Sequence, residues 1–281
     1  MQLGIRLHDV KEAPIEERLR IAKEQGFACA HMAVPMVMKD ISTATDAFTP
    51  GFAMYLKNLY AKNQLDCAVL GCYLNLANPN QAQLKATVER YKAHIRFASL
   101  LGAGVVGTET GAPNEDYHFE EACHTKEALD LFIKNVKPVV AYAEKMGVIL
   151  AIEPVYRHIV CNPKRAREVL DRIDSPNLQI IFDPVNMLEM CNYKEREEIF
   201  AEAIDLLGDD IAMVHIKDFV IEDGKLISCA AGTGEMDYTP IIRFIKQRKP
   251  FIHATLEDTV PQNAVESRMF IQKMWDEMPV V

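Results

Sequence analysis

Four residues that can bind a divalent metal each follow or end a short apolar segment in the second half of the sequence. The segments read VILAIEP, QIIFDP, IAMVHIKD and FIHATLED, and the residues are Glu153, Asp183, His215 and Glu257. Their intervals of 30, 32 and 42 residues are close to the length of one strand–helix–strand repeat. Three carboxylates and one imidazole that meet at one point require a cation between them. The pattern therefore predicts a metal site.

The types of these ligands indicate which ion the site would take. Carboxylate and imidazole ligands without thiolate suit Mn²⁺, Mg²⁺, Co²⁺ or Zn²⁺, and they argue against an iron–sulfur cluster or a structural zinc site. Four protein ligands leave coordination positions open for oxygens of a substrate. We therefore expect one divalent metal ion as the cofactor.

The elements that must position these residues alternate along the whole chain. Helical patterns with apolar residues at three- and four-residue spacing separate the β-rich segments, and several of these patterns stop at a glycine. Eight such repeats over 281 residues predict a (β/α)8 TIM barrel in a single domain, residues 1–281. The candidate strands are 3–8, 28–34, 66–74, 104–110, 148–154, 178–183, 211–217 and 251–257, and the clearest helical patterns are 15–26, 52–63, 81–102, 124–147 and 163–173.

An open doubly wound sheet is the main alternative to a barrel. That fold usually carries a glycine-rich turn after its first strand, whereas here the first strand leads into HDVKEAPIEER, which contains no glycine. No linker or low-complexity segment divides the chain. The barrel is therefore the preferred interpretation.

A barrel would bring the four residues together at one rim. Side chains alternate along a strand, so Glu153 shares its face with Ala151, and Asp183 shares its face with Ile181. These apolar companions suit the barrel interior, with the polar residues as its top layer. Active sites of such barrels lie at the carboxyl ends of the strands. Strands 5 and 8 lie far apart around the ring, so we expect Glu153 and Glu257 to face one another across the site.

Long connections after three strands would surround this rim. They follow strands 2, 4 and 7, and the first comprises residues 35–51. After strand 7, Asp223-Gly224 stands between alternating apolar residues and predicts a β-hairpin. Loops at the carboxyl ends of strands commonly determine specificity.

Composition excludes several classes of partner. The net charge of −9 argues against nucleic acid, since affinity for a phosphate backbone depends on Lys and Arg. No apolar run approaches the roughly 20 residues that a membrane-spanning helix needs. Seven scattered cysteines without a CxxC pair, and a start without the pattern of a secretory signal, are typical of a reducing compartment. We expect a cytoplasmic protein that binds neither nucleic acid nor membrane; a homo-oligomer is left open.

Short motifs across nearly the whole chain resemble a known family. They are AIEP at 151–154, FDPVNM at 182–187, VHIKD at 214–218, GTGEMDY at 232–238 and LED at 256–258. With them the chain resembles the xylose isomerase-like TIM barrels, the sugar phosphate isomerase/epimerase superfamily that also includes endonuclease IV. The resemblance implies that Glu153, Asp183, His215 and Glu257 are the metal ligands. In the ketose 3-epimerases of this superfamily, the glutamates that match Glu153 and Glu257 also act as the catalytic acid/base pair.

The chemistry of the residues agrees with these implied roles. A metal ion bound to a carbonyl and the adjacent hydroxyl acidifies the neighbouring C–H and stabilises an enediolate. Two facing carboxylates can then remove a proton from one side and return it from the other, which is epimerisation. Return to the neighbouring carbon is aldose–ketose isomerisation. We expect a metal-dependent isomerase or epimerase that acts on a small sugar or sugar phosphate.

Two departures from the 3-epimerase pattern leave the reaction open. Those enzymes have a substrate-binding histidine three residues after the metal aspartate, where this chain has Asn186, and an arginine beyond the metal histidine, where the nearest cation is Lys217. VHIKD looks more like the inosose dehydratases and hydroxypyruvate isomerases. An inosose-type dehydratase, a lyase, and a non-catalytic metal-dependent sugar-binding barrel are the alternatives. An endonuclease IV-like nuclease fits less well, because the chain is acidic and lacks the extra strand-end histidines.

Further residues near the expected rim are candidates for substrate binding. Glu109 ends strand 4 and His8 ends strand 1, but a capping acid and a structural rim histidine are the alternatives. Arg157 follows the Glu153 strand, where a loop arginine can also be merely solvated. The glycines of GTG at 232–234 could cradle a phosphate or simply shape a turn. The substrate-binding candidates are Asn186, Lys217, Glu109, His8 and Arg157.

Overall fold

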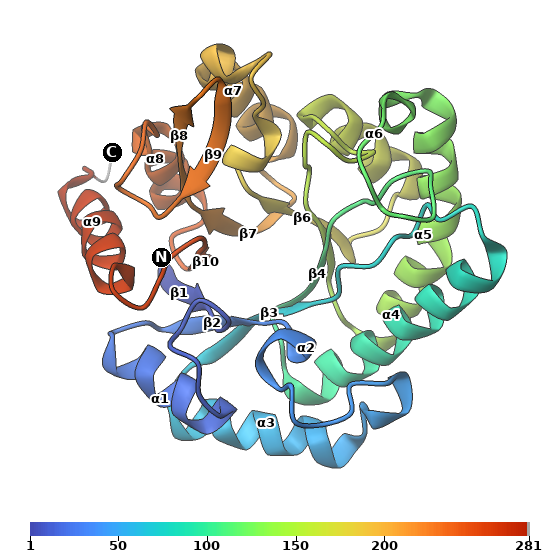
Figure 1. Cartoon of the computed structure of the whole chain (residues 1–281), viewed down its shortest axis with the longest axis horizontal. Helices are drawn as coiled ribbons and strands as arrows, with labels where there is room; N and C mark the ends of the chain where they lie inside the picture. The colour runs from blue at the N-terminus through green and yellow to red at the C-terminus, as the bar shows by residue number, and fades with distance from the viewer. Residues whose placement is uncertain (280–281) are drawn as a thin grey trace.

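Eight parallel strands close into a barrel in the computed structural model, which describes residues 1–279. Their order around the ring is β1-β10-β7-β6-β5-β4-β3-β2 (Figure 1). The predicted (β/α)8 architecture is confirmed, and each predicted strand has its counterpart. The barrel strands are β1 (Gln2–Arg6), β2 (Cys29–Met32), β3 (Asp66–Gly71), β4 (Val105–Thr108), β5 (Leu150–Ile152), β6 (Leu178–Phe182), β7 (Ile211–Ile216) and β10 (His253–Leu256).

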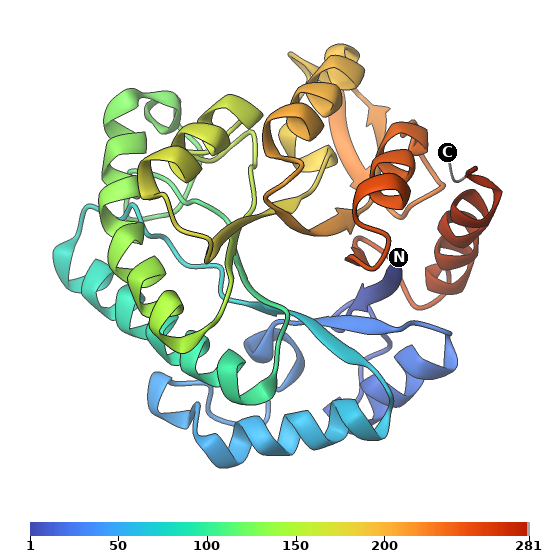
Figure 2. The same ribbon diagram turned by 180° about the vertical axis from the view of Figure 1, so that it is seen from behind.

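Helices surround the barrel on its outside, as both face views show (Figures 1 and 2). Local signals set both ends of α4, one of the two longest helices. The Asn80 side chain accepts hydrogen bonds from the first amides of α4, and Gly102 ends this helix in the left-handed region at φ 82°. The helices are α1 (Ile15–Glu24), α2 (Val34–Val37), α3 (Pro50–Lys62), α4 (Gln81–Leu101), α5 (Lys126–Met146), α6 (Pro163–Ile173), α7 (Arg196–Leu207), α8 (Thr239–Arg248) and α9 (Ala264–Glu277), with 3-10 turns η1 (Thr45–Ala47), η2 (Glu121–His124), η3 (Val185–Met187) and η4 (Tyr193–Glu195).

A β-hairpin follows β7 on the face of the barrel shown in Figure 1. It consists of β8 (Asp218–Glu222) and β9 (Lys225–Cys229), which pair antiparallel. Asp223 and Gly224 form its turn, with φ of 49° and 71°. Two left-handed residues match the twist of a two-residue hairpin. The predicted hairpin is therefore confirmed.

The core has two layers. The larger layer lies between strands and helices, and the smaller one fills the barrel interior. Ala151 and Ile181 belong to the interior cluster, as the alternation of side chains predicted. The polar residues that follow on the same faces therefore lie at the carboxyl end of the barrel. Within residues 1–279, no helix is long and apolar enough to cross a membrane.

Candidate active site

The four predicted metal ligands converge at the carboxyl rim of the barrel. Glu153, Asp183 and Glu257 directly follow β5, β6 and β10, and His215 lies near the end of β7. These strands are consecutive in the ring. Each of the four residues is at most 4% exposed. Short strands ending at one rim thus bring together four side chains whose successive positions are 30 to 42 residues apart in the sequence.

His215 lies between the two glutamates. Its Nδ1 is 3.2 Å from Glu257 Oε1 and 3.3 Å from Glu153 Oε2. Neither ring nitrogen makes an aligned hydrogen bond to any described residue. Burial lowers the pKa of this imidazole, but the attraction of Glu257 and Glu153 outweighs it and raises the pKa to about 9. Two carboxylates directed at one ring nitrogen form an arrangement that a shared cation would satisfy.

The backbone turn after β6 fixes Asp183. Its Oδ1 accepts hydrogen bonds of 3.0 Å from the amides of Val185 and Asn186. Its Oδ2 is left facing the site, 2.8 Å from Lys217 Nζ. Burial raises the pKa of this carboxyl to about 6, against the effect of Lys217. A carboxylate oxygen has two lone pairs, so Oδ2 can contact the ammonium and still bind an ion.

Lys217 and Asn186 both reach the predicted ligands directly. The Lys217 ammonium lies 2.8 Å from Asp183 Oδ2 and 3.1 Å from Glu257 Oε2, and the residue is 5% exposed. Burial lowers the pKa of Lys217, but Asp183 and Glu257 outweigh it and hold the pKa above its usual value. The Asn186 amide donates to Glu153 Oε1 over 2.6 Å. Lys217 thus neutralises the carboxylates of Asp183 and Glu257, and Asn186 orients Glu153.

Two overlapping groups of side chains have the geometry to hold a metal ion. One is Glu153, Asp183 and His215; the other is His31, His215 and Glu257. In each group the potential ligand atoms all lie within 4.8 Å of one another. The buried His215 nitrogens without hydrogen-bond partners and the mixed oxygen–nitrogen donors fit a divalent ion. Which ion the site prefers depends on how many imidazoles participate.

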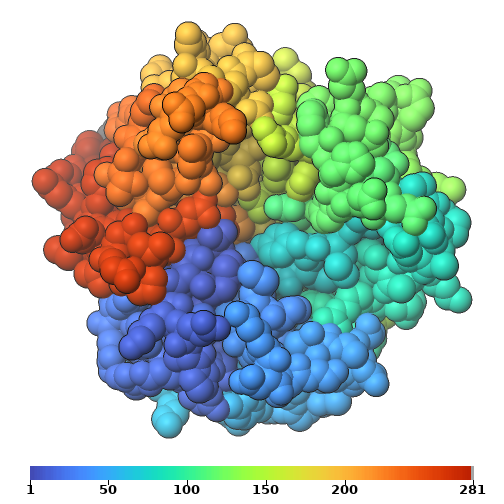
Figure 3. All heavy atoms as spheres, viewed as in Figure 1, coloured from blue at the N-terminus to red at the C-terminus, as the bar shows by residue number. Residues whose placement is uncertain are grey.

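A cavity of about 390 Å³ opens onto this cluster. The space-filling view, taken from the hairpin side of the barrel, shows segments from the whole length of the chain around the middle of the molecule (Figure 3). Of the substrate-binding candidates, Asn186, Lys217, Glu109 and His8 line the cavity. The lining residues are Arg6, His8, His31, Ala33, Met36, Tyr73, Glu109, Glu153, Asn186, Lys217, Ser228, Glu257 and Asp258.

Arg157, the fifth substrate-binding candidate, is not among these lining residues. Its side chain is 65% exposed, and its Nε lies 2.6 Å from the Glu189 carboxylate. Arg157 lines an adjoining pocket, which shares Asn186 and Ser228 with the cavity, and the Glu189 carboxylate pairs with its guanidinium. Its role as a substrate-binding residue stays a prediction.

Glu109 faces the cavity from the end of β4. Tyr117 donates its hydroxyl to Glu109 Oε2 over 3.1 Å, and His158 Nδ1 lies 3.6 Å from the same oxygen. Burial and the nearby Glu153 raise the pKa of Glu109 to about 7. A carboxyl that is half protonated near neutral pH can both donate to and accept from a sugar hydroxyl.

The cavity residues that escaped prediction include three polar residues from β1, β2 and the segment after β3. Arg6 approaches Glu257 Oε2 at 3.4 Å and Asp258 Oδ1 at 2.8 Å. The Tyr73 hydroxyl forms a 3.0 Å hydrogen bond with His31 Nε2. In the sequence, Arg6 could have been noticed as a charged residue within GIRL, and His31 as a histidine within the apolar run ACAHMAV.

The GTG turn does not present a free phosphate cradle. The amides of Gly232 and Gly234 both donate to Asp218 Oδ2, at 3.1 and 2.9 Å. Asp218 Oδ1 accepts from the amides of Phe219 and Met236 at 2.9 Å. A carboxylate of the chain itself therefore occupies the site that an anion would need, and the alternative reading of a structural turn is correct.

Comparison with protein families identifies the fold family. Residues 19–274 match the sequence model of the xylose isomerase-like TIM barrel family. The chain belongs to this family. A curated relative of this xylose isomerase-like barrel is the 3-oxo-isoapionate decarboxylase of Pectobacterium atrosepticum, with 27% identity over 164 residues. The matched region covers 56% of this chain and 56% of that protein, about half of each.

Solved structures of similar proteins share the fold over almost their whole length. A D-tagatose 3-epimerase-like protein has a TM-score of 0.75 at 21% identity, over 98% of this chain and 97% of that chain. The 3-keto-D-glucoside 4-epimerase from E. coli has a TM-score of 0.75 at 15% identity, over 97% and 99%. The IOLI protein, solved with a zinc atom, has a TM-score of 0.74 at 15% identity, over 100% of both chains.

Proposed function

We propose that this xylose isomerase-like barrel is a metal-dependent sugar isomerase or epimerase. The observation that carries the proposal is the position of Glu153 and Glu257. Their carboxylates approach the same nitrogen of His215, at 3.3 and 3.2 Å, from strands on different sides of the cluster. Both glutamates also line the cavity. Two carboxylates that reach one reaction centre are what a proton transfer between two positions of a sugar requires.

The residues divide into those that hold an ion and those that move protons. Asp183 and His215 would hold a divalent ion together with the two glutamates. When bound, such an ion supplies Lewis-acid chemistry, polarising a carbonyl and acidifying the adjacent C–H. Glu153, oriented by the Asn186 amide, and Glu257, oriented by the Lys217 ammonium, would remove and return the proton. Glu109 and His8 would bind substrate hydroxyls from the other side of the cavity.

The cavity favours an unphosphorylated sugar as the substrate. Its volume of about 390 Å³ is at the lower end of the range for small-molecule pockets. Both fixed cations that line it are engaged, Arg6 with Asp9 and Asp258 and Lys217 with Asp183 and Glu257. Asp218 fills the amide cradle nearby. A phosphate dianion would therefore meet carboxylates rather than free donors.

A lyase reaction is the second candidate. The curated relative bears the name of a decarboxylase for a 3-oxo acid. Loss of CO₂ next to a polarised carbonyl leaves the same kind of carbanion as removal of a proton, so one site could support either reaction. The inosose-type dehydratase belongs to the same class, because expulsion of a β-hydroxyl also starts from that carbanion.

Incubation with candidate sugars in deuterated water tests the proposal. Metal-loaded protein would be given free ketoses, 3-oxo sugars and inosose, with products followed by NMR. Deuterium at a retained carbon of a rearranged sugar supports an isomerase or epimerase. Release of CO₂ or net loss of water identifies the lyase. Saturable ligand binding without label exchange would instead indicate the non-catalytic sugar-binding barrel.

A further inference from the structure

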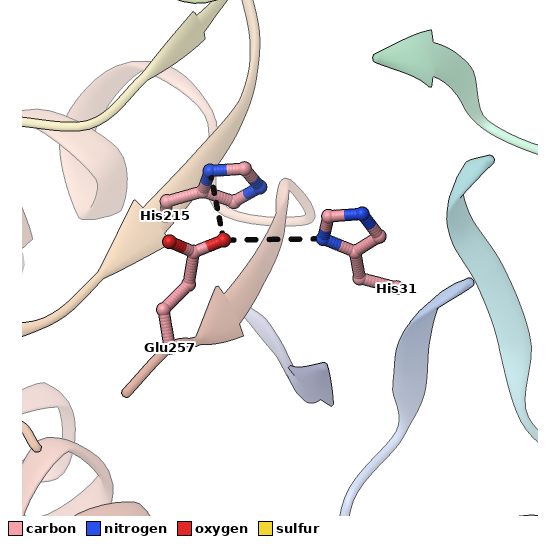
Figure 4. A group of neighbouring side chains, drawn as sticks. All are labelled: His31, His215 and Glu257. Atoms are coloured by element: carbon pink, nitrogen blue, oxygen red, sulfur yellow. Dashed lines mark ion pairs between the residues drawn. The ribbon is translucent and has the colours of Figure 1, made fainter. Parts of the chain in front are cut away.

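One buried histidine on the opposite side of the cluster has no role in the proposed function. His31 belongs to β2, is 1% exposed, and lines the cavity. Its ring stacks on that of His215, with centroids 5.5 Å apart and planes inclined by 8°. Figure 4 shows that Glu257 reaches toward both imidazoles. The distances from Glu257 Oε1 are 3.2 Å to His215 Nδ1 and 3.9 Å to His31 Nδ1.

The two nitrogens of His31 have different environments. Nε2 contacts the Tyr73 hydroxyl at 3.0 Å. Nδ1 is buried and makes no hydrogen bond to any residue in the described part of the chain. A histidine that ligates a metal almost always has its second nitrogen fixed by a hydrogen bond, which sets both the tautomer and the ring orientation. Tyr73 provides that support, and Nδ1 is the free ligand atom.

The backbone makes room for this pair. A Cβ on Gly71 would lie 2.7 Å from the Tyr73 ring and 2.9 Å from His31 Nε2. Both distances are shorter than a side chain tolerates, so the Tyr73–His31 contact depends on glycine at this position of β3. The placement of His31 is thus built into two neighbouring strands.

The spacing between Glu257 and each of the two imidazoles agrees with one ion. Two donors that each lie about 2.1 Å from a metal can be at most about 4.2 Å apart. The 3.9 Å between His31 Nδ1 and Glu257 Oε1 falls within this limit, although it is too long for a hydrogen bond. The ligand atoms of His31, His215 and Glu257 all lie within 4.8 Å of one another, so the two imidazoles would move closer by at most about 0.6 Å to share the ion.

We propose that His31 is an additional ligand of the metal ion, bound through Nδ1 next to His215 and Glu257. The ion would then have two imidazoles and carboxylates around it. Imidazole suits Zn²⁺ and Co²⁺ better than Mg²⁺ or Mn²⁺, which prefer oxygen. His31 thus biases the site toward Zn²⁺ or Co²⁺ and occupies a position that the four-ligand arrangement leaves open to substrate. This inference rests on the metal centre of the proposed function.

Titration of the metal-depleted full-length chain with Co²⁺ tests this assignment. We expect His31→Ala to weaken Co²⁺ binding by at least about tenfold, the lower range for loss of a metal-site contact. The visible Co²⁺ spectrum should change as a nitrogen ligand is replaced by water, and added imidazole should restore it. The affinity for Zn²⁺ relative to Mn²⁺ should fall in the same variant. His31→Gln provides a bulkier replacement should the alanine variant fail to fold.

His253→Gln is the matched control. His253 begins β10 at the opposite end of the strand from Glu257 and pairs with Asp66, so its loss should leave the Co²⁺ affinity and spectrum unchanged. If the His31 variants bind Co²⁺ like the wild type while Asp183→Asn does not, His31 is not a ligand and the proposed function stands. If Asp183→Asn also keeps full affinity, the metal centre itself is misassigned. Lower affinity with an unchanged spectrum would also overturn the proposal, because it would indicate only a structural defect.

Discussion

Replacement of Lys217 by methionine tests the electrostatics of the cluster most directly. The ammonium is buried and contacts Asp183 and Glu257 at 2.8 and 3.1 Å. Methionine keeps much of the side-chain volume but removes the charge, so two buried carboxylates lose a cation. Removing one partner of a buried ion pair typically costs about 3–5 kcal/mol. We expect the metal-free variant to lose stability by that amount.

The expected change in melting temperature follows from the size of the chain. An unfolding entropy of about 2.1 cal/mol/K per residue gives about 0.6 kcal/mol/K for 281 residues. A loss of 3–5 kcal/mol then lowers the Tm of the metal-free protein by about 5–8 °C. A divalent ion restores positive charge at the same carboxylates. Saturating metal should therefore raise the Tm of Lys217→Met by more than it raises that of the wild type.

Differential scanning calorimetry with and without Zn²⁺ or Mn²⁺ measures both effects. Lys57→Met is the control, because Lys57 is exposed on α3 and forms no ion pair among the described residues. Its Tm should match that of the wild type in both conditions. Equal metal-free Tm values for Lys217→Met and the wild type, with equal shifts on adding metal, would refute the argument that Lys217 neutralises the cluster.

Three further predictions concern the metal, the proton transfer and the substrate. His215→Ala should remove most of the bound metal, as measured by mass spectrometry of the purified protein. In the wild type, the affinity for the metal ion should rise by up to about tenfold per pH unit toward pH 9, because the ion competes with a proton on His215 whose pKa is about 9. Glu153→Gln and Glu257→Gln should each lower turnover by about 10²–10⁴-fold while Tm falls far less than in Lys217→Met, and equal activity would contradict their role as acid and base. Calorimetric binding should be tighter for a free ketose than for its phosphate ester, and the reverse order would show that a phosphate site exists.

The raised pKa of His215 also affects the stability of the metal-free fold. The pKa of His215 is raised from its usual 6.5 to about 9, so its proton stabilises the folded state. That contribution is fully present below pH 6.5 and disappears as the pH rises through 9. Metal-free protein should therefore lose stability across this window, and metal-loaded protein should not.

The amino-acid sequence was sufficient to predict the fold and the convergence of the four candidate ligands because each strand end carries its own local pattern. An apolar run that ends in Glu153 or Asp183 can be recognised without knowing its neighbours, and Asp223-Gly224 specifies its own turn. The single domain over residues 1–281 and the roles of the site residues stay predictions. The contact made by Arg157 depended on a long-range partner, Glu189, which no local pattern indicates.

His31 could not be assigned from its strand pattern for a specific reason. The pairing of β2 with β3 shifts register between Ala30 and His31, whose partners are Cys67 and Val69. The extra residue, Ala68, lies on β3, so the alternation along β2 is kept: Cys29 belongs to the interior cluster and His31 lines the cavity. The run ACAHMAV is apolar on both faces of the strand, so it does not indicate which face turns into the barrel. The closed barrel and the space that Gly71 leaves determine that His31 does.

Asn186 and Lys217, the two departures from the 3-epimerase pattern, each act on one glutamate: Asn186 orients Glu153, and Lys217 neutralises Glu257. With His31 as a further ligand, the site would differ from that pattern on the β2 side as well, and the added imidazole would change which ion it prefers.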